Sequence, residues 1–79
     1  MIPEHSIVVL NRDLPESGLS MGDVGAVVHV YQAGMAYEVE FVDGDGSTVA
    51  LETLEAKDVR PLARGELLHA RKRHLTQAD

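Results

Sequence analysis

Two kinds of residue in this chain could do chemistry: four histidines and thirteen carboxylates. His5 precedes Ser6, and this is the one adjacent imidazole and hydroxyl pair. Nucleophilic catalysis needs such a pair to be oriented by a carboxylate, inside a site that excludes water and supplies preorganised donors. The pair stands near the start of the sequence, with no pocket expected to enclose it. We therefore expect no catalytic residues and a protein that is not an enzyme.

The histidines are also poorly spaced for a metal. His69 and His74 are five residues apart, so they would not share a helix face as a pair spaced by four would. His29 is a single residue within a predicted strand, and a partly buried side chain with one hydrogen bond explains it better. A closed zinc site needs about four ligands, and the chain has no cysteine. We expect no metal site and no cofactor.

Residues 43–47 alternate aspartate and glycine, which suggests the first half of a calcium loop. Such a loop needs glycine at its sixth position and glutamate at its twelfth. Those positions hold Thr48 and Leu54 here. A turn between two strands is therefore the better interpretation of the segment.

The remaining carboxylates divide the chain by charge. The formal net charge is −6, and residues 1–60 contain eleven acids against three bases. Residues 61–79 contain two acids against four bases. This pattern predicts an acidic folded body followed by a basic tail. No apolar run approaches the roughly 20 residues that would span a membrane, and no signal peptide is evident, so we expect a cytoplasmic protein with no membrane contact.

The elements that must position these residues are mostly strands. Short β-branched or alternating runs predict them at residues 7–10, 26–31, 37–41, 48–53 and 59–60, with one helical turn over 54–58. Residues 11–23 are rich in turn formers and predict a long loop, which should pack its Leu14, Leu19 and Met21 on the body. The expected fold is all-β: a small five-stranded SH3-like barrel over residues 1–61, whose closure would leave no exposed sheet edge.

A hairpin centred on Asp45 fixes the expected register of the third and fourth strands. The expected inward pairs are Phe41 with Val49, Val39 with Leu51, and Tyr37 with Thr53. The same register sets Glu38 opposite Glu52 on the outer face, because side chains alternate along a strand. The expected acidic hairpin face, a possible protein-binding surface, consists of Glu38, Glu40 and Glu52, with Asp43 and Asp45 at its end.

The basic tail, residues 62–79, predicts a helix after Pro61. Its apolar residues are Leu62, Leu67, Leu68, Ala70 and Leu75, and Gly65 weakens its start. Arg71, Lys72 and Arg73 form a basic run, which is a possible contact for phosphate or a solvated helix face held against the carboxylates of the body.

Residues 22–30, with glycines before a bent apolar strand, resemble the KOW-type element of SH3-like barrels. A wider pattern resembles a short bacterial family of unknown function over about residues 6–61. It comprises residues 7–19, 22–25, 37–41 and 58–61. The resemblance implies an SH3-like fold and assigns no activity. Similar barrels are accessory parts of larger assemblies, such as nitrile hydratase β subunits.

Three functions follow from these observations. The first is a non-catalytic protein-binding module, an adaptor or inhibitor that uses the acidic face to attract a basic partner, although such a face is also an ordinary solvated surface. The second is a KOW-like nucleic-acid module that uses the tail, which the charge of −8 on residues 1–60 opposes. The third is an accessory barrel of an enzyme assembly. We expect another protein as the partner, and nucleic acid binding is disfavoured.

Overall fold

A computed structural model describes residues 1–73 of the chain, in which all regular structure is strand or short 3-10 turn. The strands are β1 (Ile7–Leu10), β2 (Val24–Tyr31), β3 (Ala36–Val42), β4 (Thr48–Glu55) and β5 (Val59–Pro61). The 3-10 turns are η1 (Pro15–Ser17), η2 (Gln32–Gly34) and η3 (Ala56–Asp58). The all-β prediction is confirmed, including the single helical turn before the last strand.

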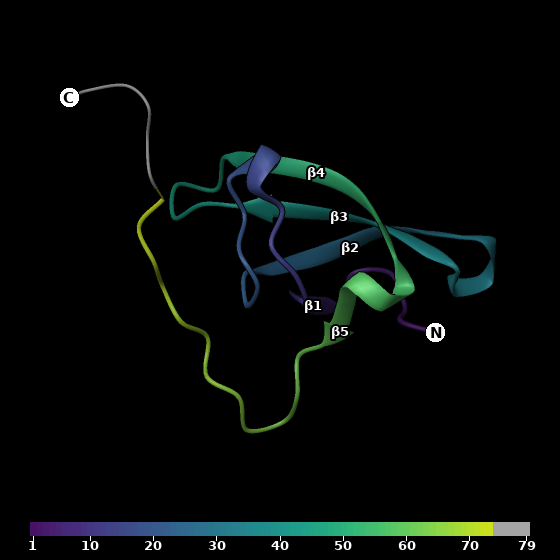
Figure 1. Ribbon diagram of the computed structural model, residues 1–79. Coiled ribbons are helices and arrows are strands. Elements are labelled where there is room, and N and C mark those ends of the chain that lie inside the picture. The colour runs from purple at the N-terminus through teal and green to yellow at the C-terminus, as the bar shows by residue number, and fades with distance from the viewer. Residues whose placement is uncertain (74–79) are drawn as a thin grey trace.

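The five strands form one antiparallel sheet in the order β4-β3-β2-β1-β5 (Figure 1). The sheet is not closed, because β4 and β5 each pair with only one neighbour and remain edges. This finding differs from the expected closed barrel. β2 contains an irregularity between Val27 and His29, where its pairing with β3 shifts by a residue. Such a shift bends a strand and increases its twist.

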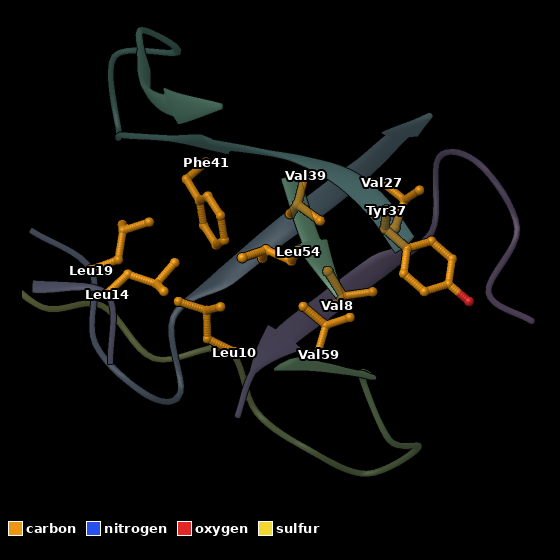
Figure 2. Packing of buried hydrophobic residues seen from close by; sticks show 10 residues of the cluster. All are labelled: Val8, Leu10, Leu14, Leu19, Val27, Tyr37, Val39, Phe41, Leu54 and Val59. Carbon is orange, nitrogen blue, oxygen red and sulfur yellow. The ribbon is translucent and has the colours of Figure 1, made fainter. Parts of the chain in front are cut away.

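The core lies on the concave side of this sheet (Figure 2). Its buried members are Val8, Leu10, Leu14, Leu19, Val27, Tyr37, Val39, Phe41, Leu54 and Val59. The long loop contributes Leu14 and Leu19, as expected, and their backbones pair with each other. Met21, in contrast, is 64% exposed, so its predicted packing is wrong. Its backbone amide bonds to the Asp13 side chain at 2.8 Å, which leaves the residue in an outer turn.

Gly25 in β2 is required by close packing. A Cβ atom there would lie 2.7 Å from Cγ1 of Val39 and 2.9 Å from the backbone oxygen of Glu40. Real Cβ contacts are not that short, and the backbone of β3 cannot move aside as a flexible side chain can. The glycine therefore lets β2 lie directly against the core face of β3.

The predicted hairpin register holds beside the turn and fails farther along. Val42 pairs with Thr48, as a hairpin centred on Asp45 requires. The register then shifts between Phe41 and Val42, and β4 gains one extra residue there. The pairs beyond are Phe41 with Ala50, Val39 with Glu52, Tyr37 with Leu54, and Glu38 with Thr53. A shift of one residue reverses the faces of β4, so Leu54 enters the core and Leu51 turns outward.

The predicted C-terminal helix is absent from residues 62–73, which have neither helix nor strand. Positions 74–79 of that prediction lie outside the described residues. Gly65 adopts a left-handed φ of 89°, and the Glu66 carboxylate accepts a hydrogen bond from the backbone amide of Ala63 at 2.6 Å. Leu67 and Leu68 are 91% and 68% exposed. A helix here would gain little apolar burial, which is the main source of helix stability in proteins.

Candidate functional site

Glu38 and Glu40 occupy the outer face of β3, as predicted. Glu38 lies opposite Thr53, and Glu40 lies opposite Leu51. The Tyr31 hydroxyl donates to Glu38, and the Thr48 hydroxyl donates to Glu40 at 2.6 Å. The hydrogen bond to Glu38 raises the pKa of Tyr31 above its ordinary value. Both carboxylates are only partly exposed, and each is positioned by a neighbouring strand.

Glu52 does not join this outer face. It pairs with Val39, a buried residue, on the inner side of β4. The Ser17 hydroxyl of η1 donates to its carboxylate. Glu52 therefore connects the edge of the sheet to the long loop, and it lines a cavity of about 310 Å³ with Arg12 and Leu14. The extra residue in β4 is the physical reason for this change of face.

Asp43 and Asp45 lie at the hairpin turn, as expected. Asp43 Oδ1 accepts hydrogen bonds from the backbone amides of Asp45, at 2.9 Å, and of Ser47, at 3.1 Å. These bonds are typical of an aspartate that stabilises its own turn. The other oxygen, Oδ2, lies 3.8 Å from Nη2 of Arg73. Asp43 thus connects the turn of the hairpin to the tail.

A second carboxylate of the body holds the tail more tightly. Arg71 donates from Nε and from Nη2 to the two oxygens of Asp23, at 2.8 Å and 2.6 Å. It also donates to the backbone oxygen of Gly18 at 3.1 Å. The bonds from Arg71 and from the Ser20 amide hold the pKa of the Asp23 carboxyl below its ordinary value, against the opposing effect of partial burial.

Arg71 and Arg73 therefore lie against carboxylates of the body, but from a segment without helix and not from the expected helix face. Lys72 between them is exposed. Asp23 was not among the predicted site residues, because its partner is 48 positions away and no local pattern links the two. The signal that could have found it is the excess of acid in the body opposite the basic run.

The tail and the body enclose a cavity of about 350 Å³, which we call the tail groove. It is lined by Leu19, Asp23, Val24, Phe41, Val42, Asp43, Gly44, Val49, His69, Ala70, Arg71 and Arg73. Apolar side chains at one end of the core line this groove, together with the carboxylates of Asp23 and Asp43. Such a mixture of apolar surface and a few placed polar groups is typical of a binding site.

The histidines among residues 1–73 are placed without a common centre. The His29 side chain is 54% exposed, so the expected partial burial is wrong. Its ring packs edge to face against the Tyr31 ring, with 4.5 Å between the two ring centroids. Its Nδ1 lies 3.7 Å from a carboxylate oxygen of Glu4. His5 is exposed and has a left-handed φ of 72°. Within residues 1–73, no three side chains of metal-binding type come together.

The fold and these contacts define a small all-β protein with a five-stranded antiparallel sheet and an acidic body that holds a basic segment. A family model described as a domain of unknown function (DUF4926) matches residues 4–61, and the chain belongs to that family. The match ends at the last strand, as did the expected resemblance. No curated protein and no solved structure gives a significant match. In the described part of the chain, no helix has the length and apolarity to cross a membrane.

Proposed function

We propose that the protein is a non-catalytic binding module whose acidic hairpin recognises a basic segment of another protein. The observation that carries the proposal is the contact of Arg73 with Asp43 in the hairpin turn, beside the contact of Arg71 with Asp23 just before β2. The body already holds two guanidinium groups, so its carboxylates have the placement that a cationic partner needs. Glu38 and Glu40 add negative charge on the outer face of the same hairpin.

An SH3-like architecture belongs to the same proposal. The long loop between β1 and β2, the tight hairpin of β3 and β4, and the 3-10 turn before β5 are the parts expected of such a barrel. The bend in β2 and the curvature of the sheet around the core agree with it. An experimental structure would test it, and strands arranged as two flat, separately packed sheets would contradict it.

The test of function compares captured partners. Cells of the source organism would be probed with the full chain, with the variant Glu38→Lys/Glu40→Lys, and with Glu4→Lys/Glu16→Lys as a matched control. All four residues carry one negative charge, and Glu4 and Glu16 lie outside the hairpin. We expect the unmodified chain and the control to capture a basic protein. The hairpin variant should fail to capture it.

Two results would overturn the proposal. Equal capture by the hairpin variant and the control would show that the hairpin is not the binding surface. Recovery of RNA or DNA alone, in a manner that depends on salt, would favour the nucleic-acid alternative.

A further inference from the structure

One side of the tail groove is a segment of the chain, residues 69–73, that little else holds in place. Leu62 donates a backbone hydrogen bond to Ile7 at 3.2 Å, and Arg60 pairs with Glu66. Beyond Glu66, within the described residues, the polar contacts of the tail with the body are those of Arg71 and Arg73. The two leucines before them are largely exposed. Residues 69–73 are thus held beside the body by side-chain contacts and form no strand pair.

The other side of the groove is built by the body. Phe41 and Leu19 lie at the same end of the core and form its apolar floor (Figure 2). The Ser20 amide fixes Asp23 at 2.8 Å, and the hairpin turn fixes Asp43. Since these bonds come from the backbone of the body, both carboxylates keep their positions when the tail leaves.

The contacts also define the kind of segment that fits. Asp23 receives two parallel bonds from one guanidinium, which the fork of arginine provides and the single ammonium of lysine does not. Arg71 and Arg73 line the groove with Ala70, whereas Lys72 does not. In an extended chain, residues two apart lie on one side, so the two carboxylates match an Arg-x-Arg spacing.

We propose that the body side of the tail groove, with Asp23 and Asp43, is a recognition site for an extended Arg-x-Arg segment of a partner protein, and that residues 69–73 of this chain cover these carboxylates as an internal competitor. The inference rests on the proposed function and names the segment that the acidic body binds. A short linker gives the internal segment an effective concentration near the millimolar range. A partner must therefore bind more tightly than the tail, or bind when the tail has been displaced.

The experiment uses the full-length chain and a fluorescent peptide with the sequence of residues 67–73. Binding is measured by anisotropy for the unmodified protein and for Arg71→Ala/Arg73→Ala, which should release the tail and leaves the body side of the groove unchanged. We expect the released variant to bind the peptide about ten-fold more tightly, because the internal competitor is gone. Adding Asp23→Asn/Asp43→Asn to the released variant should abolish binding, and a peptide with lysine at both arginine positions should bind more weakly.

Folding of each variant is checked by the amide NMR spectrum, in which Gly18 and Asp23 should shift when peptide is added. Equal peptide binding by the released and unmodified proteins would overturn internal competition and leave the proposed function standing. If the released variant is folded but binds no peptide, the groove is not a recognition site. In that case, loss of the captured partner by Glu38→Lys/Glu40→Lys would still support binding at the hairpin. If the unmodified protein sediments as a dimer that Arg71→Ala/Arg73→Ala converts to a monomer, the occupant is the tail of a second copy, and the proposal is overturned.

Discussion

Phe41 and Glu40 are neighbours in β3 and have opposite environments. Phe41 is 3% exposed at the end of the core, and Glu40 lies on the outer face. Phe41→Ala should destabilise the fold by about 3–5 kcal/mol, because it leaves a cavity that the small core cannot refill. Total stability for a domain of this size is on the order of 5 kcal/mol, so this variant should be largely unfolded.

The matched control is Glu40→Ala, which removes an exposed contact with Thr48 and should change the free energy of unfolding by less than about 0.5 kcal/mol. Urea denaturation measures both variants. The assignment of the two faces of β3 would be wrong if Glu40→Ala were the more damaging change.

Gly25→Ala tests the close approach of β2 to β3. The added methyl group would lie 2.8 Å from Cε2 of Phe41 and closer still to Val39, so we expect a loss of about 1–3 kcal/mol from overpacking. Gly44→Ala is the control, because a Cβ there meets no atom within 4 Å and the backbone φ is not left-handed. Thermal unfolding should separate the two variants clearly, and equal melting temperatures would contradict the packing described for Gly25.

For individual residues, the sequence predicted the core positions of β3 well and the polar contacts poorly. Alternation identified Tyr37, Val39 and Phe41 as inward residues, because burial follows the strand period. It did not link Asp58, which is 5% exposed, to Arg12, although the two pair at 2.9 Å. Side-chain pairing between distant segments depends on tertiary structure, and no local spacing encodes it.

Among the elements, all five strands and η3 could be predicted from apolar runs and turn residues, but the bulge in β4 could not. A single extra residue changes the face of every later side chain. Alternation around Val49 favours the regular register, with Leu51 inward and Glu52 outward, so the observed register is determined by packing. Leu54 gains a buried position, and the cost of turning Glu52 inward is offset by its contact with Ser17 at the sheet edge.

The tail contacts should respond to acid and not to moderate changes of pH. The pKa of Asp23 is lowered by its bonds to Arg71, and that of Glu66 is lowered to about 2 by Arg60 and the Ala63 amide. A carboxyl with a lowered pKa stabilises the paired state above its ordinary pKa of about 4 and loses that effect as pH falls through the lowered value. The tail should therefore stay in place from pH 8 to pH 5 and leave only below about pH 4.

The measurement is the NMR shift of the Gly18 amide between pH 8 and pH 2, with Arg71→Ala as the reference for a released tail. Release centred near neutral pH would show that Asp23 is not the group that holds Arg71.

For the whole molecule, the boundary between body and tail leads to a further prediction. The sheet is complete at Pro61, and the pairs that hold the tail are partly exposed, so each contributes only about 0–1 kcal/mol. Deleting residues 63–79 should leave a cooperatively folding body that loses at most about 2 kcal/mol. Thermal unfolding with circular dichroism tests this expectation, and loss of the cooperative transition would show that the tail is part of the core.

The order in which the sheet can assemble follows from the position of β1. β1 lies between β2, the next strand in the chain, and β5, the last strand, and Val8 pairs with Pro61. That pairing requires closure of nearly the whole body into one loop before the contacts of β5 with β1 are gained. Proteins dominated by such non-local pairs refold in milliseconds to seconds. Stopped-flow refolding should show this slow step, and the hairpin of β3 and β4, which is local, should form before it.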